Sequence, residues 1–290
     1  MKKLFYLLAI ACLAASCGGN NEEEKKKETD DPSSSLWKMQ LYAPSLVQVY
    51  AENELVESYS FEFDGNMRVT SLLRKDEIAG KALLDLAYTY SGKSDMSVSG
   101  TFYSTAAAKT VNASIDGKTV TYKGDWDNAR QYKTTYDANG TVTATDAALE
   151  FAPTSGQYSS LGTYSEVYKV SSGNVTSATL GADITSQSSK SAKLESSKEL
   201  TIEYTYSDKP DKQNFNVFLM NCEFPVWFAK ELPGCKNLIS GMKMKCGSVT
   251  LPQSFKVEYT FDSGGDILTA TRKDYNDSEL VLTRVYKLTY

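Results

Sequence analysis

The chain contains no histidine among its 290 residues. This absence removes Ser-His-Asp and Cys-His nucleophilic pairs, histidine general bases and histidine metal ligands together. The sequence also lacks a glycine-rich phosphate loop, a G-x-S-x-G nucleophile elbow and zinc-type cysteine spacing. We therefore expect a protein that is not an enzyme and holds no cofactor, although two carboxylates that meet in space could still hydrolyse a glycoside.

Excess positive charge is missing as well. The chain has 31 Lys and Arg residues against 36 Asp and Glu residues, which gives a formal net charge of −5. A mildly acidic chain has little long-range attraction for a phosphate backbone, so we expect no nucleic-acid partner. With 41% hydrophobic and 23% charged residues, the composition is that of a globular protein.

The N-terminus has the pattern of an export signal. Lys2 and Lys3 precede the apolar run Leu4–Leu13, which is too short to span about 30 Å of hydrocarbon as a helix. Small residues at 14–16 then lead into Cys17, as in the bacterial lipobox, where the cysteine becomes the first mature residue and carries acyl chains. We predict a lipoprotein signal peptide over residues 1–16 and a membrane anchor at Cys17. The alternative is an ordinary signal peptide with a chance cysteine.

Residues 17–35 are almost without apolar side chains and read as a flexible acidic tether. The cluster Glu22-Glu23-Glu24 resembles the export signal that sends lipoproteins of Bacteroidetes-type bacteria to the outside of the outer membrane. A solvated spacer would have the same composition. We expect a protein anchored by lipid to the outer membrane, with exposure at the cell surface if the acidic cluster acts as that signal.

From residue 36 to residue 290 the dominant hydrophobic period is two, which is typical of strands. Tyr59, Phe61 and Phe63 share one face, for example, and Asp116-Gly117 gives the signal of a tight hairpin. The pattern predicts a single all-β domain, an antiparallel meander of hairpins that forms one curled sheet or an open barrel-like sheet. Only Lys75–Leu86 and Pro225–Leu232 have the pattern of short helices.

The lipobox, the acidic tether and the tyrosine-rich hairpins resemble the uncharacterised lipoproteins of Bacteroides and its relatives. Leu232-Pro233-Gly234-Cys235-Lys236-Asn237-Leu238 and the later Leu251-Pro252 are similar to segments of one family of unknown function, DUF4595. That resemblance implies a porin-like β fold over residues 37–290. It supplies no catalytic residues to transfer.

Cys222, Cys235 and Cys246 remain once the two N-terminal cysteines are set aside. In an exported chain they allow one disulfide and leave one cysteine over. The favoured pair is Cys222–Cys235, which encloses Pro225–Pro233 and would leave Cys246 unpaired. Buried free thiols are the alternative.

Met242, Met244 and Cys246 point the same way if their segment is a strand. Three soft sulfur ligands on one face could hold Cu(I), although methionine and cysteine are also ordinary core residues. We expect core packing here and no bound metal.

The last segment ends in the aromatic Tyr290, as do the C-terminal strands of integral outer-membrane barrels. Both of its faces carry charge, however, with Arg284 on the apolar face and Lys287 on the other. Lipid-facing charge at mid-bilayer costs about 2–4 kcal/mol. We therefore expect a barrel-like sheet in water, held at the membrane by its anchor.

Three functions fit these observations. The first is a non-enzymatic binding or accessory module for glycan or peptide, which predicts an exposed aromatic cluster in a concave surface. The second is a structural or assembly lipoprotein that pairs a sheet edge with a protein partner, which predicts an unpaired edge strand. The third is a carboxylate hydrolase, which predicts two carboxyl groups about 5–10 Å apart in a cleft.

Overall fold

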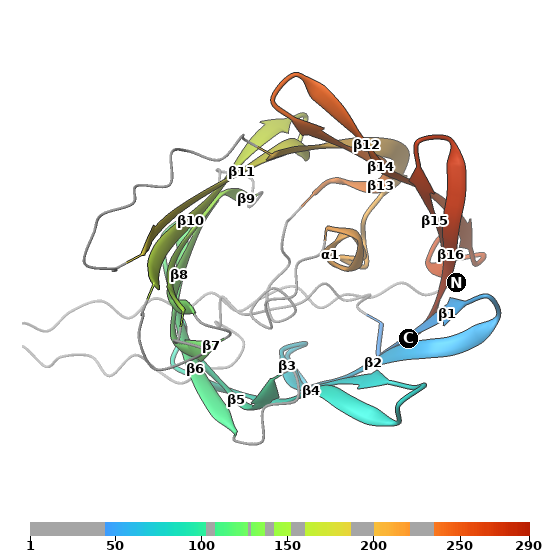
Figure 1. The fold of residues 1–290 in the computed structure, drawn as a ribbon. Helices are drawn as coiled ribbons and strands as arrows, with labels where there is room; N and C mark the ends of the chain where they lie inside the picture. Colours follow the sequence, from blue (N-terminus) through green and yellow to red (C-terminus); the bar gives the residue numbers. More distant parts are fainter. Residues whose placement is uncertain are drawn as a thin grey trace, which may run out of the picture.

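The computed structural model describes residues 44–102, 108–126, 129–136, 142–151, 160–186, 200–220 and 235–290, and most of them lie in antiparallel strands (Figure 1). The strands are β1 Leu46–Ala51, β2 Glu54–Phe63, β3 Val69–Asp76, β4 Lys81–Ser91, β5 Asp95–Phe102, β6 Lys109–Asp116, β7 Thr119–Trp126, β8 Ala129–Tyr136, β9 Val142–Phe151, β10 Ser160–Ser171, β11 Asn174–Ser186, β12 Leu200–Pro210, β13 Asn237–Cys246, β14 Val249–Phe261, β15 Ile267–Asn276 and β16 Glu279–Thr289. One short helix, α1 (Asn216–Leu219), follows β12. The predicted all-β meander is confirmed.

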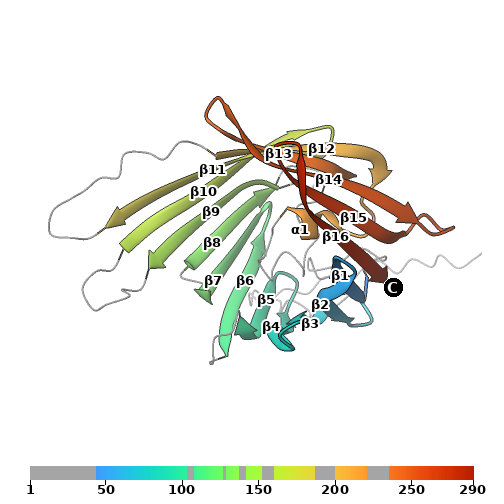
Figure 2. The ribbon, with the colours of Figure 1, turned by 45° about the vertical axis from the view of Figure 1, so that its right-hand side comes forward.

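The meander closes on itself. Each strand pairs with the strand before it and the strand after it, and β1 also pairs with β16, from Leu46 opposite Thr289 to Ala51 opposite Arg284. The narrowest seam joins β11 to β12, where four residues from Ser177 pair with four residues from Leu200. Figure 2 shows the strands tilted side by side around the wall. Closure satisfies the sheet edges, a point that the sequence pattern did not decide.

Alternation along each strand separates an inner from an outer face. Helix α1 lies within the ring of strands (Figure 1), and its aromatic side chains contact the wall. The ring of Phe218 packs edge-on against Tyr59 with centroids 5.1 Å apart, and Phe215 packs in the same way against Tyr286 at 5.5 Å. The face that carries Tyr59 and Tyr286 is therefore the inner one.

The inner face is apolar and forms the core of the protein. Since side chains alternate with a period of two, one register fixes which residues point inward on every strand. The buried inward residues include Val47, Val49, Phe61, Leu72, Leu84, Leu86, Met96, Val98, Val111, Val120, Ala178, Phe255, Val257 and Ala270.

The helix predicted over Lys75–Leu86 is wrong. This segment holds the end of β3, the turn over residues 77–80 and the start of β4, with the Ala79 N–H donating to the Asp76 carboxylate at 2.9 Å and Gly80 at a φ of 63°. Leu84 and Leu86 alternate inward and lie opposite Arg74 and Leu72 of β3. Because β3 buries both leucines, pairing outweighs the local helical spacing. The second predicted helix, Pro225–Leu232, lies outside the described residues.

Helix α1 was not predicted, because four residues give no periodic signal. The Asp211 carboxylate accepts hydrogen bonds from the N–H groups of Phe215 (2.7 Å) and Asn216 (3.0 Å), which have no partner within so short a helix. The Asn216 side-chain amide then donates to the Asn237 carbonyl and accepts from the Ile239 N–H, both at 2.8 Å. These bonds fix the helix against β13.

Candidate functional site

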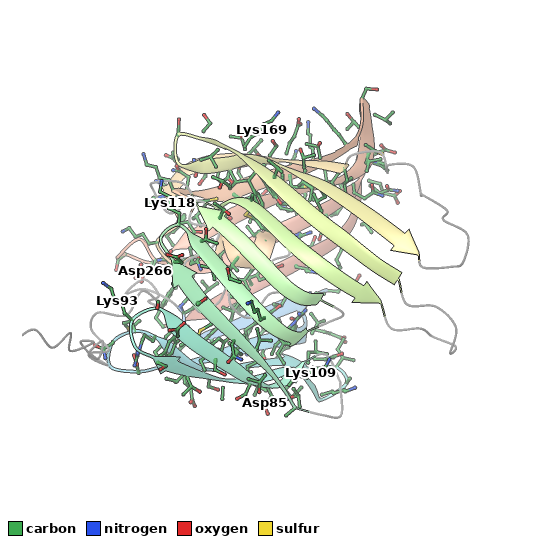
Figure 3. All side chains as sticks on the ribbon, turned by 90° about the vertical axis from the view of Figure 1, so that its left-hand side faces the viewer. Asp85, Lys93, Lys109, Lys118, Lys169 and Asp266 are labelled. Carbon is green, nitrogen blue, oxygen red and sulfur yellow. The ribbon has the colours of Figure 1, made fainter. Side chains whose placement is uncertain are left out.

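The outer face of the barrel is polar. On β2 the positions between the inward aromatics are Ser58, Ser60 and Glu62. Asp85 and Lys169, both labelled in Figure 3, alternate with buried inward residues on β4 and β10 and therefore lie on the outer face. A barrel that spans a membrane has the opposite arrangement, an apolar outward band about 25 Å tall and a polar interior.

Exposed aliphatic side chains do occur, but most of them lie at hairpin ends. Ile78 is in the β3–β4 turn, Val249 begins β14, and Leu280 and Val281 begin β16. The ends of these hairpins lie on one rim of the barrel, because antiparallel neighbours return to the same side. The exposed aliphatic side chains therefore cover part of one rim of the barrel and do not form an apolar band around its outer wall.

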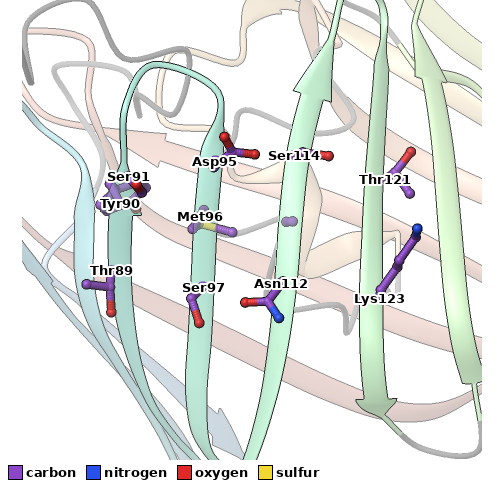
Figure 4. A pocket seen from close by; sticks show the side chains of 11 residues that line it. Thr89, Tyr90, Ser91, Asp95, Met96, Ser97, Asn112, Ser114, Thr121 and Lys123 are labelled. Atoms are coloured by element: carbon purple, nitrogen blue, oxygen red, sulfur yellow. The ribbon is translucent and has the colours of Figure 1, made fainter. Parts of the chain in front are cut away.

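A hollow of about 540 Å³ crosses the outer face of β4, β5, β6 and β7 (Figure 4). Outward-facing polar side chains dominate its lining, which consists of Thr89, Ser91, Asp95, Ser97, Asn112, Ser114, Thr121 and Lys123. Tyr90, Met96 and Ala113, from alternate positions on the same strands, also border it.

The lining offers several hydroxyl groups and one carboxamide, with one cation at Lys123 and one anion at Asp95. Hydroxyls and amides both donate and accept hydrogen bonds, which suits a ligand that is itself rich in hydroxyl groups. Among the described residues of the lining, Asp95 is the single carboxylate, so they do not supply the acid pair that glycoside hydrolysis requires. No sequence pattern indicates the hollow, because its residues come from four strands with no shared motif.

The inner face carries a small set of paired charges near the β1–β2 and β15–β16 hairpins. Arg74 bonds to Glu57, and Asp274 accepts from both Arg272 and Arg284 at 2.8 Å. Arg284 thus lies on the apolar face of β16, as predicted, while Lys287 lies outside over the ring of Tyr50. Burial is the main reason why the pKa of Tyr286, next to these arginines, is raised.

The cysteine prediction is tested only in part. Cys235 and Cys246 are free thiols, and Cys222 lies outside the described residues. The Cys235 thiol is buried and lies 3.4 Å from the Tyr206 hydroxyl. Burial raises the pKa of the Cys235 thiol to about 11 despite that hydrogen bond. The Cys222–Cys235 bridge stays a prediction.

The sulfur-containing segment lies on β13, and its alternation is as expected. Met242 pairs with Tyr204 and Phe255, Met244 with Ile202, and Cys246 with Leu200. These neighbours are apolar or aromatic and make a packing environment. Within the described ranges, no group of three His, Cys, Asp or Glu side chains is placed to hold a metal ion.

Residues 1–35, with the predicted signal peptide, Cys17 and the acidic tether, lie outside the described residues. In the described part of the chain, no helix has both the length and the apolar character needed to cross a membrane.

No protein-family model matches the chain, and no curated protein matches it. Membership of DUF4595 therefore stays a prediction. Eleven chains of solved structures match. One is a porin-like protein from Bacteroides uniformis, which is 9% identical, covers 85% of this chain and 96% of its own, and gives a TM-score of 0.40.

Proposed function

We propose that this chain is a lipid-anchored, non-enzymatic binding protein of the outer membrane, whose barrel stands in water and holds a glycan across the outer hollow of β4–β7. The observation that carries the proposal is the polarity of the wall, apolar inside and polar outside. Burying the outer Glu62, Asp85 and Lys123 in hydrocarbon would cost several kcal/mol. An anchor at Cys17 would supply membrane attachment without a spanning segment.

The glycan is favoured by the lining of the hollow. Thr89, Ser97, Asn112 and Thr121 can donate and accept hydrogen bonds at the sugar hydroxyls, and the opposite charges of Lys123 and Asp95 leave the lining neutral. The aromatic residues expected on such a surface are mostly on the inner face, so hydrogen bonding would contribute more than ring stacking.

The two other candidate functions have less support. Strand addition needs a free edge, and each described strand has a neighbour on both sides, although part of β11 extends beyond its pairing with β12. A carboxylate hydrolase needs an acid pair, and Asp95 is the one carboxylate that the described lining residues supply.

The test uses the full chain carrying Cys17→Ser, screened against an array of soluble glycans and peptides. We expect this variant to leave the membrane fraction and to bind a glycan that Asn112→Ala weakens roughly tenfold, since one side-chain amide can make two or three hydrogen bonds. Thr110→Ala, at the neighbouring outward position of β6, is the matched control. Tight membrane retention would defeat the anchor, and equal loss in both β6 variants would defeat the site.

A further inference from the structure

The outward side chains that line the outer hollow form two complete rows across β4, β5, β6 and β7, because each is the direct cross-strand partner of the next (Figure 4). The first row is Ser91, Asp95, Ser114 and Thr121. The second row is Thr89, Ser97, Asn112 and Lys123. Strands lie about 4.8 Å apart, so each row is about 14 Å long, whereas the rows are only about 7 Å apart along a strand. The hollow is therefore longest across the strands.

The polar groups of the two rows are open to a ligand. On other strands, outward polar side chains bond to one another: the Lys273 ammonium donates to Glu258 at 2.9 Å, and the hydroxyl groups of Thr260 and Thr269 lie 2.7 Å apart. In the two rows, no side chain has a hydrogen bond or an ion pair with any described residue. Donors and acceptors are thus available along both rows from β4 to β7.

The floor between the rows is backbone. Met96 and Ala113 belong to the lining, but their side chains are buried on the inner face, so the main chain is the part of each that borders the hollow. The row side chains are short except for Lys123 at the β7 end. A flat ligand can therefore lie close to the strands, with polar groups on its two edges facing the two rows.

An extended glycan chain has the dimensions of this surface. In such a chain each pyranose ring advances by roughly the distance between neighbouring strands, about 4.8 Å, so a chain that crosses the strands presents one sugar to each strand. Its hydroxyl groups lie on both edges of the ribbon, where they can donate to and accept from the side chains of both rows. A coiled chain, or a branch on a central sugar, would lift rings away from the rows.

We propose that the outer hollow binds an unbranched, extended glycan chain that runs across β4–β7 with one sugar at each strand. This assignment rests on the proposed function, since it specifies the class of glycan that the hollow holds. Among the described lining residues, the rows run from Thr89 and Ser91 on β4 to Thr121 and Lys123 on β7. A chain of about four sugars covers that length, and a disaccharide leaves half of each row without a partner.

The experiment measures binding by calorimetry to the full chain carrying Cys17→Ser. Cellohexaose, xylohexaose and β-mannohexaose are the extended chains, and maltohexaose is the coiled one. Cellohexaose and maltohexaose contain the same glucose units and differ in their glycosidic linkage, hence in chain shape. We expect at least one extended hexasaccharide to bind at least tenfold more tightly than maltohexaose and than its own disaccharide. Maltohexaose binding as tight as that of every extended chain, or equal affinity for disaccharide and hexasaccharide, would overturn the proposal.

Substitutions at opposite ends of the second row test the direction of the chain. Thr89→Val on β4 and Lys123→Ala on β7 should each weaken hexasaccharide binding at least fivefold, because a chain across the strands loses a hydrogen bond at either end. The matched controls Thr110→Val and Lys118→Ala lie outside the lining and should change nothing; all four positions are exposed, so folding should not be affected. A loss in only one of Thr89→Val and Lys123→Ala would overturn the crossing orientation.

The glycan array separates failure of the extended chain from failure of the proposed function. If the array yields a branched or coiled glycan whose binding Asn112→Ala weakens, while none of the three extended hexasaccharides binds, the hollow remains a glycan site and the extended chain is overturned. If no glycan binds at all, both proposals fail.

Discussion

The Tyr206 hydroxyl on β12 donates a 2.6 Å hydrogen bond to the carbonyl oxygen of Val175 on β11. These strands share the narrowest seam of the barrel, where backbone pairing covers only four residue pairs. Burial and the neighbouring Cys235 raise the pKa of Tyr206, so the phenol keeps its proton for this bond. The side chain joins the two strands just beyond their backbone pairing.

Replacing Tyr206 by Phe should lower the free energy of unfolding by about 1–2 kcal/mol, because the Val175 carbonyl loses its donor in a buried place. Urea unfolding followed by circular dichroism measures the difference. Tyr275→Phe is the matched control, since the Tyr275 hydroxyl has no hydrogen bond to the described residues. Equal unfolding free energies for the two variants would mean that the seam does not need this bond.

Gly100 on β5 lies where no side chain fits. Its φ is +147°, and a Cβ added there would lie 1.9 Å from the Asp85 carbonyl oxygen of β4. We expect Gly100→Ala to destabilise the barrel by roughly 3 kcal/mol or more, because backbone must move to relieve the overlap. The melting temperature should fall accordingly.

Gly117→Ala is the control for this substitution. Gly117 also has a positive φ, +54°, but nothing lies within 4 Å of its added Cβ. Gly117→Ala should lower the free energy of unfolding by about 1–2 kcal/mol, because only the left-handed backbone conformation disfavours the new side chain. If Gly100→Ala is no worse than Gly117→Ala, the close approach of β4 and β5 does not limit stability.

Much of the fold could be predicted from the period of two. The shared face of Tyr59, Phe61 and Phe63, and the opposite faces of Arg284 and Lys287, follow from strand geometry alone and are confirmed. The same rule gave no information on closure, because pairing of β1 with β16 joins opposite ends of the domain. The alternation of hydrophobic residues predicts which way a side chain points, but it does not predict which distant strand pairs with its own.

The candidate sites were harder to predict for the same reason. The outer hollow collects single residues such as Thr89, Asn112 and Thr121 from different strands, and none of them is unusual in its own segment. Arg284 was recognised as a charge on an apolar face, but its partner Asp274 lies on another strand. Helix prediction failed at 75–86 because tertiary pairing outweighed local spacing.

Asp211 should be essential for the short helix inside the barrel. Its buried carboxylate accepts from the N–H groups of Phe215 and Asn216, and Asp211→Ala would leave both donors without a partner. We expect a loss of about 2 kcal/mol or more in unfolding free energy. Asp208→Ala, at a side chain 87% exposed, should change it little, and a similar loss there would argue against capping.

The two thiols in the described part of the chain should differ in reactivity. Since the thiolate is the reactive form, the buried Cys235 with its pKa raised to about 11 should label slowly at pH 8 and faster as the pH rises toward 11. Cys246 is partly exposed and should label first. Alkylation followed by peptide mass spectrometry measures both.

The same measurement decides the predicted Cys222–Cys235 bridge. Denatured without reductant, a chain with three free thiols is alkylated at Cys222, Cys235 and Cys246 alike. A bridged chain is alkylated at Cys246 alone until a reductant is added. Since Cys235 is a free thiol in the structure, the alternative of free thiols predicts alkylation at all three sites. Protection of Cys222 and Cys235 together would establish the predicted disulfide.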